Sequence, residues 1–283
     1  MNLSVITVTW NNEDEIAEQI RSVRSACNDI EFEQIIVDND SPDDTVKVIE
    51  KNFPEVKLIA NKENKGFGTA NNQGVEQAEG EFLLFLNPDM KLKEGSLDKI
   101  VKWMRDNEDV GIACPKLINE DGSFNEHASP RSFPTVLEQL AIIFKIPHIF
   151  PSVLDRYLMT DFDPSKEREV DSVRGSFMLM RREIVEELGW AFDPRYFIWY
   201  EDVDICREVK SLGYKVMYTP VIEAVDYVGK SFGQRRGLWK QKNFTESMLK
   251  YFKKWEPFYK WIWIAMARPI GIFMVWLQEK IIN

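Results

Sequence analysis

The sequence has few of the residues that carry disulfide, zinc or covalent nucleophilic chemistry. Its three cysteines, Cys27, Cys114 and Cys206, lie far apart and show no ligand-like spacing, so neither a disulfide framework nor a zinc site is expected. Its two histidines, His127 and His148, lie in an irregular, proline-punctuated segment, and we assign them no catalytic role. Because no serine or cysteine is accompanied by a histidine pattern that suggests a triad, a covalent hydrolase mechanism is disfavoured.

Positive charge is also in short supply. The chain has 36 basic and 46 acidic residues and a formal net charge of -10, which argues against general nucleic-acid binding because that binding depends on lysine and arginine. Any phosphate ligand must therefore be bound by specific groups gathered at its own site rather than by a generally basic surface. The opening residues lack the pattern of a secretory signal, so we expect a cytoplasmic location.

What the sequence does contain is an alternation of short apolar strands and amphipathic helices. Residues 3–10, 34–37 and 56–60 predict strands. Helices are expected after the first strand and from Ser41-Pro42. This alternation indicates an α/β fold with a mainly parallel sheet.

Polar residues follow several of these strands. A further strand over residues 82–86 ends at Asn87-Pro88-Asp89, and parallel sheets place ligands at such carboxyl ends. We therefore expect these strand-end residues to meet on one rim: Thr9, Trp10, Asn11, Asp38 and Asp89.

The second half of the chain is less regular at first. Residues 120–170 are rich in turns and prolines and are interpreted as an irregular, partly mobile acceptor-side segment. Strands are then expected over residues 176–180 and 214–218, with helices from Arg182 and over residues 201–212.

The C-terminal segment is unusually rich in aromatic residues. Its apolar stretch from Trp261 to Leu277 is slightly short for a membrane span and is interrupted by Arg268-Pro269. Tryptophan, tyrosine and lysine suit a membrane interface, so docking on a membrane surface is favoured. A soluble packing or dimerisation helix, and a true spanning helix, are the alternatives.

Two acidic motifs are candidates for chemistry. Asp89 could bind Mg²⁺ or Mn²⁺ bridging a diphosphate, although in isolation a simple turn is the favoured interpretation. Glu201, Asp202 and Asp204 begin an expected helix, where acids also serve as partners of the helix dipole. We choose Asp202 as a general base, with Glu201 and Asp204 orienting the acceptor or the helix. Asp38 and the following Asn39-Asp40-Ser41 are either a capping turn or contacts to base and ribose.

Together these motifs resemble those of the family 2 glycosyltransferases of the GT-A fold, and within them a bacterial rhamnosyltransferase-like branch. The resemblance runs from about Leu3 to Ser231. The matching motifs, in order, are VITVTWNN, IIVDNDSPD, NKENKGFGTANNQG, FLNPDM, RGSFMLMRREIVEELG and FDPRYFIWYEDVDICREVKSLGYKV.

The resemblance implies specific roles. Asn87-Pro88-Asp89 replaces the usual metal-binding Asp-x-Asp, which makes Asp89 the principal ligand of Mg²⁺ or Mn²⁺, and the catalytic base is Asp202. The donor nucleotide sugar is expected to contact Thr9, Asn11, Asp38, Lys65, Gly66, Asn71, Asn87 and Asp89. The acceptor is expected to contact Trp199, Glu201 and Asp204.

One position departs from the family pattern. Where the family usually has His-x-x-Gly-x-Ser, this chain has Asp226 followed by Tyr227-Val228-Gly229-Lys230-Ser231. Asp226 could still bind a hard cation through oxygen. Alternatively, Lys230, Arg235 or Arg236 supplies more of the charge that neutralises the leaving group.

The resulting prediction is an inverting hexosyltransferase that moves rhamnose from dTDP-rhamnose to a glycan or lipid-linked glycan acceptor of a bacterial cell surface. Residues 1–118 would bind the donor, 119–230 would bind acceptor and carry catalysis, and 231–283 would form a helical segment at the inner face of the membrane. A silent nucleotide-sugar-binding subunit of a membrane assembly is the main alternative, and a nucleotidyltransferase is a weaker one. No nucleic-acid partner is expected, and a homodimer is left open.

Overall fold

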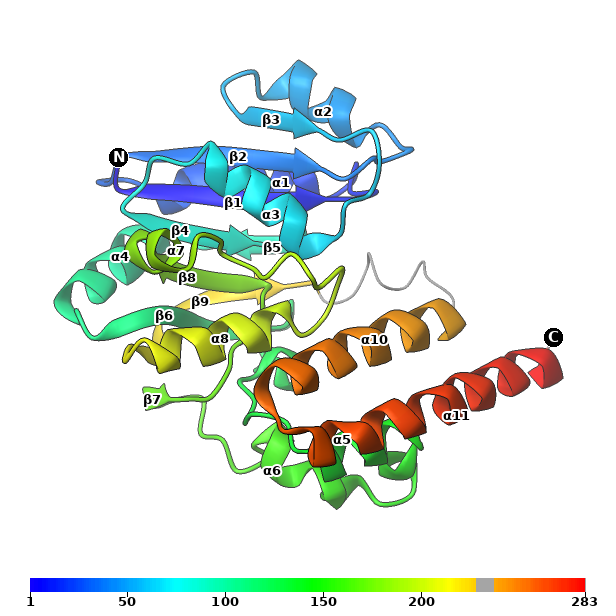
Figure 1. Cartoon of the computed structure of the whole chain (residues 1–283). Helices are drawn as coiled ribbons and strands as arrows, with labels where there is room; N and C mark the ends of the chain where they lie inside the picture. The colour runs from blue at the N-terminus through cyan, green and yellow to red at the C-terminus, as the bar shows by residue number, and fades with distance from the viewer. Residues whose placement is uncertain (228–236, 283) are drawn as a thin grey trace.

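One sheet organises the described residues, 1–227 and 237–282, of the computed structural model (Figure 1). The order of its strands is β3-β2-β1-β4-β8-β6-β9-β5, and β7 pairs with β9 outside this path. The strands are β1 Leu3–Thr9, β2 Phe32–Asp38, β3 Lys57–Ala60, β4 Phe82–Leu86, β5 Met90–Leu92, β6 Val110–Ile118, β7 Arg168–Glu169, β8 Phe177–Arg181 and β9 Lys215–Asp226.

The first four strands of the path form the expected parallel half. β1 runs parallel to both β2 and β4, and β2 runs parallel to β3. All five residues of β4 are buried, as an apolar run covered on both faces requires. The other half is mixed, because β8 runs antiparallel to both β4 and β6 and β5 runs antiparallel to β9. The sheet is therefore less parallel than the sequence indicated.

Helices cover the two faces of this sheet (Figure 1). The α-helices are α1 Ile16–Ala26, α2 Thr45–Asn52, α3 Phe67–Glu76, α4 Ser96–Asp106, α5 Val136–Ile143, α6 Asp155–Leu158, α7 Arg182–Leu188, α8 Glu201–Ser211, α10 Gly237–Trp255 and α11 Phe258–Ile282. The 3₁₀ segments are η1 Glu126–Ala128, η2 Ile146–His148 and η3 Pro151–Leu154. α1 contacts α4 on one face, whereas α3 packs on β1 and β2 from the other.

Two sequence-based expectations were wrong at their boundaries. α2 begins at Thr45 rather than at Ser41, because the backbone N–H and hydroxyl of Ser41 both donate to the carboxylate of Asp38 and hold a turn. β9 continues past Tyr218 to Asp226, because Lys116 to Ile118 of β6 pair with its second half after a register shift.

Two further expectations concerned helices. The segment 120–170 is not wholly irregular, since it contains α5, whose capping box joins Thr135 and Glu138. The interruption expected at Arg268-Pro269 is absent, because α11 runs through Pro269.

A second hydrophobic cluster joins the C-terminal helices to the loop before α8. Tyr196 and Tyr200 of that loop pack with Met248, Tyr251 and Ile264 of α10 and α11. α10 and α11 are therefore packed into the same structure as the sheet rather than forming a separate appendage.

A buried ionic contact reinforces this junction. The ammonium of Lys254 in α10 donates to Asp204 of α8 at 2.6 Å, and it lies 2.7 Å from Glu208 and 3.1 Å from Asp193. Asp204 is fully buried and also accepts a hydrogen bond from Trp255 Nε1 at 2.6 Å. The burial makes this contact sensitive to the loss of either partner.

We expect Lys254→Met to lower the free energy of unfolding by about 3 kcal/mol, because it leaves a buried carboxylate without its counter-charge. Urea denaturation followed by circular dichroism measures the change. The matched control, Lys102→Met, removes an exposed pair with Asp106 and should cost about 0.5 kcal/mol or less. Adding Asp204→Asn to Lys254→Met should recover part of the loss. Equal effects of the Lys254 and Lys102 substitutions would show that the buried ion pair contributes no more to the free energy of unfolding than the exposed one.

Candidate active site

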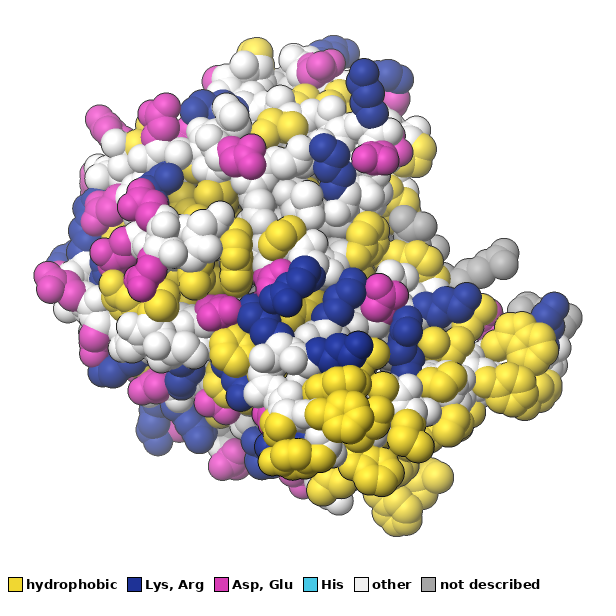
Figure 2. All heavy atoms as spheres, in the orientation of Figure 1, with side chains coloured by type: hydrophobic (Ala, Val, Ile, Leu, Met, Phe, Trp, Pro, Cys, Tyr) yellow, Lys and Arg dark blue, Asp and Glu magenta, His cyan; other side chains and the backbone are white. Residues whose placement is uncertain are grey.

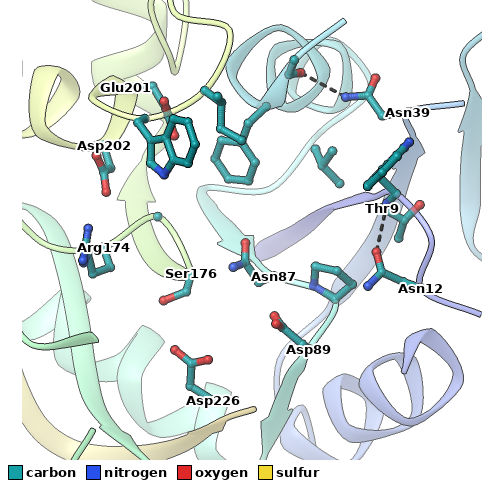
Figure 3. A pocket seen from close by; sticks show the side chains of 18 of the residues that line it. Thr9, Asn12, Asn39, Asn87, Asp89, Arg174, Ser176, Glu201, Asp202 and Asp226 are labelled. Carbon is teal, nitrogen blue, oxygen red and sulfur yellow. Dashed lines mark hydrogen bonds between the residues drawn. The ribbon is translucent and has the colours of Figure 1, made fainter. Parts of the chain in front are cut away.

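A cavity of about 370 Å³ lies at the carboxyl ends of β1 and β4 and extends to the start of α8 (Figure 3). Thr9 lines it at the end of β1, Asn87 and Asp89 after β4, and Glu201 and Asp202 at the start of α8. The edge of the sheet that the sequence marked as ligand-facing is therefore the edge that holds the cavity.

Neutral polar groups line the cavity on the side of β1 and β2. Asn39 follows β2, and its amide joins two loops: Nδ2 donates to the carbonyl of Gly66 at 3.2 Å, and Oδ1 accepts from the backbone N–H of Lys65 at 3.2 Å. Trp10 and Asn12 also line this part of the cavity. Amides and an indole offer hydrogen bonds and a stacking face without charge, which suits a nucleoside.

Gly66 sits where two walls of the cavity approach each other. Its φ is 85°, and a Cβ at this position would lie 2.4 Å from the carbonyl oxygen of Phe197. The next residue, Phe67, donates its backbone N–H to that same oxygen at 2.8 Å. A side chain at position 66 would therefore separate the loop after β3 from the loop before α8.

Two carboxylates meet at another edge of the cavity. Asp89 and Asp226 both line it and are 6% and 7% exposed. The β5–β9 ladder brings them together: Met90 pairs with Asp226, and Tyr227 N–H donates to the carbonyl of Asp89 at 3.1 Å. Figure 3 shows both carboxylates facing the same space. Hard divalent cations prefer such oxygen ligands.

The start of α8 presents two carboxyl groups of different character. Asp202 is half-buried, and Arg174 lies on the same side of the cavity (Figure 3). Glu201 is 6% exposed, and its Oε2 is buried without a hydrogen-bond partner among the described residues. Burial, followed by the nearby charge of Asp202, raises the pKa of Glu201 well above its usual range. Glu201 therefore holds its proton more tightly than an exposed glutamate does.

The loop that delivers these two residues is held in an uncommon conformation. Trp199 and Tyr200 have φ values of 65° and 69°, a region that bulky residues seldom occupy. The Tyr200 hydroxyl donates to Gln139 of α5 at 2.6 Å, and Ser247 of α10 donates to the carbonyl of Ile198 at 2.8 Å. Trp199 lines the cavity.

Several residues predicted for the site do not line the cavity. Asp38 is buried beneath it and accepts hydrogen bonds from Thr9 and Ser41. The side chain of Lys65 is exposed, and the amide of Asn71 donates to the carbonyl of Phe67 within α3. Asn11 also lies outside the lining.

Asp204, predicted to contact the acceptor, points elsewhere. It lies three residues beyond Glu201, nearly one turn along α8, and its carboxylate is bonded to Lys254 and Trp255 of α10. Burial raises the pKa of Asp204, although the ammonium of Lys254 acts in the opposite direction. These contacts indicate that Asp204 stabilises the packing of α10 against α8.

The cavity also contains residues that sequence reasoning left out. Arg174 lies shortly before β8, within a motif already singled out, but nothing in that motif marked it as a site residue. His127 and Trp239 line the cavity from distant parts of the chain, where no local signal marks them. Lys230, Arg235 and Arg236 lie outside the described residues.

Residues 4–189 match the family described as Glycosyl transferase family 2, and the chain belongs to this family. The predicted family and the GT-A fold are confirmed. The chain is 27% identical over 249 residues to an N-acetylglucosaminyl-diphospho-decaprenol L-rhamnosyltransferase of Mycobacterium tuberculosis, covering 82% of this chain and 78% of the relative. It is 26% identical over 250 residues to the rhamnosyltransferase WbbL of Escherichia coli, covering 84% and 89%.

Solved structures share the fold at lower identity. The mannosyltransferase PcManGT of Pyrobaculum calidifontis, in complex with GDP-Man and Mn²⁺, aligns with a TM-score of 0.59 at 20% identity over 97% of this chain and 72% of that one. TarS 1–349 of S. aureus aligns with a TM-score of 0.56 at 17% identity over 89% and 72%. These are GT-A neighbours of the sheet and helices described above.

We expect Glu201→Gln to become progressively more stable than the wild type as the pH rises. Above about pH 4.3, the ordinary pKa of glutamate, the unfolded wild type releases this proton more readily than the folded protein, so its unfolding free energy falls. The glutamine variant lacks this dependence. The difference should grow by up to about 1.4 kcal/mol per pH unit until the folded pKa is passed.

Urea denaturation from pH 5 to pH 8 measures this difference. Glu186→Gln, at an exposed position of α7, is the control and should keep the wild-type profile. Parallel profiles for Glu201→Gln and the wild type would contradict a raised pKa of Glu201.

Proposed function

We propose that this family 2 glycosyltransferase moves rhamnose from dTDP-rhamnose, with inversion at the anomeric carbon, to a hydroxyl of a lipid-linked glycan in bacterial cell-surface polysaccharide synthesis. The observation that carries the chemistry is one cavity shared by a carboxylate pair, Asp89 and Asp226, and a half-buried carboxylate, Asp202. The names of both rhamnosyltransferase relatives support the donor sugar.

The donor would span the cavity from the neutral groups beside β1 and β2 to the carboxylate pair. The base and ribose would lie near Asn12, Asn39 and Gly66, and the diphosphate would reach Asn87 and the carboxylate pair. Asp89 and Asp226 bring two carboxylates to this end of the cavity, and carboxylate oxygens are ligands that a hard divalent cation prefers.

The residues present fit Mg²⁺ or Mn²⁺. No group of three or more metal-binding side chains occurs within 1–227 and 237–282, but Mg²⁺ is commonly held by one or two carboxylates, substrate phosphates and water. Asp89 and Asp226 are such a pair. When bound, the cation would neutralise negative charge on the departing diphosphate. The Mn²⁺-bound neighbour PcManGT supports the same class of cation.

Transfer itself requires one base on the acceptor side. The carboxylate of Asp202 would take the proton of the acceptor hydroxyl while that oxygen bonds to the anomeric carbon and the bond to the diphosphate breaks. Direct attack from the face opposite the leaving group inverts the anomeric carbon. Glu201 would retain its own proton more readily than an ordinary glutamate, because burial raises its pKa, and this leaves Asp202 as the base.

The acceptor and its location follow from the relatives and from the C-terminal helices. The name of the mycobacterial relative specifies a diphospho-decaprenol substrate, a lipid carrier. α11 is long and apolar enough to cross or bind a membrane. We therefore place the enzyme at the cytoplasmic surface of the membrane, where nucleotide sugars and lipid-linked glycans meet.

Asp202→Asn should lower kcat about a hundredfold or more while donor binding changes little, because the amide keeps the shape but cannot accept the proton. Transfer from dTDP-rhamnose to a lipid-linked acceptor measures the rate, and the thermal shift caused by donor and Mn²⁺ measures binding. Asp106→Asn, on the outer surface of α4, is the control. A wild type that binds donor without any transfer would instead support a silent binding subunit.

Asp89→Asn and Asp226→Asn should each weaken binding of Mn²⁺ in the presence of dTDP about tenfold or more, because each removes a charged oxygen ligand. Titration calorimetry measures the affinity independently of turnover. Asp226→His, which restores the residue usual in the family, should bind more tightly than Asp226→Asn. Wild-type affinity in both asparagine variants would show that the carboxylate pair does not bind the cation. Asp106→Asn, at an exposed position of α4, serves as the control.

A further inference from the structure

One face of α11 exposes apolar side chains to an extent unusual for a protein surface. No acidic residue occurs between Glu256 and Glu279, and Lys260 and Arg268 are the basic residues of the stretch from Phe258 to Gln278. The exposed side chains are Phe258, Tyr259, Trp263, Met266, Ile270, Phe273, Met274, Trp276, Leu277 and Ile281. In Figure 2, hydrophobic side chains gather over the part of the molecule where Figure 1 places α11. Contiguous apolar surface of this kind marks a binding face.

A second segment extends this face. α5 packs against α11 where a Cβ on Gly271 would lie 2.6 Å from Ile143, and η2 and η3 pack against α5. This segment exposes Ile149, Phe150 and Leu137, at 74%, 64% and 77%. We call the exposed apolar side chains of α11 together with these three residues the apolar face.

The opposite side of α11 is packed along the whole helix. Ile264, Ala267 and Val275 are buried against the rest of the protein. α10 and α11 are paired from end to end: Leu238 N–H donates to Glu279 at 2.8 Å near one end, and Lys253 lies over the ring of Trp261 near the other. A spanning orientation would pull α11 away from these contacts, so the packing favours a helix lying flat.

Charge indicates what covers the apolar face. Apart from Lys254, whose ammonium is paired with Asp204, residues 237–282 contain seven basic and three acidic side chains, although the whole chain has a net charge of -10. Basic side chains form a band beside the apolar face in Figure 2, and α10 exposes Lys242 and Lys253. A second copy would bring like charges together, whereas anionic lipid headgroups complement them. Tryptophan, tyrosine and phenylalanine beside lysine are typical of a membrane interface.

We propose that the apolar face is a monotopic docking surface for an anionic bilayer, with α11 lying in the interface and Ile149 and Phe150 inserting as a second contact. This surface builds on the proposed function, because it would hold the enzyme where a lipid-linked acceptor resides. Trp239 of α10 lines the cavity, so the hairpin that carries the apolar face also borders the active site.

Flotation of the full-length chain with vesicles of phosphatidylcholine and phosphatidylglycerol tests this surface. The wild type should bind anionic vesicles, and binding should weaken with salt and with phosphatidylcholine alone. The double variants Trp263→Ser/Phe273→Ser and Ile149→Ser/Phe150→Ser should each lower the partition coefficient about tenfold or more. Lys242→Gln/Lys253→Gln should lower it about tenfold on anionic vesicles alone.

Controls separate docking from folding and from catalysis. The serine substitutions lie at exposed positions, so circular dichroism and thermal unfolding should match the wild type, and transfer to a soluble acceptor analogue without vesicles should be retained. A wild type that floats with vesicles but shows no sugar transfer would overturn the proposed function and would not contradict the docking surface. A wild type that does not float would overturn the docking surface.

Three further results would also overturn it. The first is unchanged flotation of the Ile149→Ser/Phe150→Ser variant, which would remove the second contact. The second is resistance of the membrane-bound chain to alkaline carbonate extraction, which would indicate a spanning helix. The third is a dimer in light scattering that is lost in Trp263→Ser/Phe273→Ser, without vesicle binding by the wild type, which would assign the face to a second copy.

Discussion

The buried contact between Lys254 and Asp204 is the interaction on which the arrangement of the site depends. It joins α10 to α8, the helix that begins with Glu201 and Asp202, in a place where an unpaired charge would be costly. The surrounding cluster of Tyr196, Tyr200 and Tyr251 excludes water from the same junction. The position of the proposed base is therefore determined by residues about fifty positions away in the sequence as well as by its own helix.

The same junction constrains the backbone of the loop before α8. Trp199 and Tyr200 are held at positive φ by contacts from α5 and α10, and Gly66 allows the opposite wall to approach within hydrogen-bonding distance. Such strained conformations persist only where the surrounding structure compensates for them. The C-terminal hairpin thus supports the catalytic loop on one side and exposes an apolar face on the other.

Most of the fold could be predicted because its signals are local. The strands from Leu3 and Phe82 were found from runs of buried apolar residues, and α8 from the acids of its first turn. α5 was missed although Thr135 and Glu138 form a recognisable capping box, since surrounding prolines suggested irregular structure. The continuity of α11 through Pro269 was missed because proline disfavours a helix locally, whereas packing against α10 and α5 supports this one.

Local patterns and motif order are sufficient to predict the family, the alternation of strands and helices, and the strand-end residues Thr9, Asn87 and Asp89 that line the cavity. Motif order also marked Asp226 as a candidate ligand, but strand pairing brings it beside Asp89, and the packing of distant segments adds His127 to the cavity and directs Asp204 toward Lys254. These outcomes depend on strand register and on helix packing between distant segments. No local pattern in the sequence encodes such contacts.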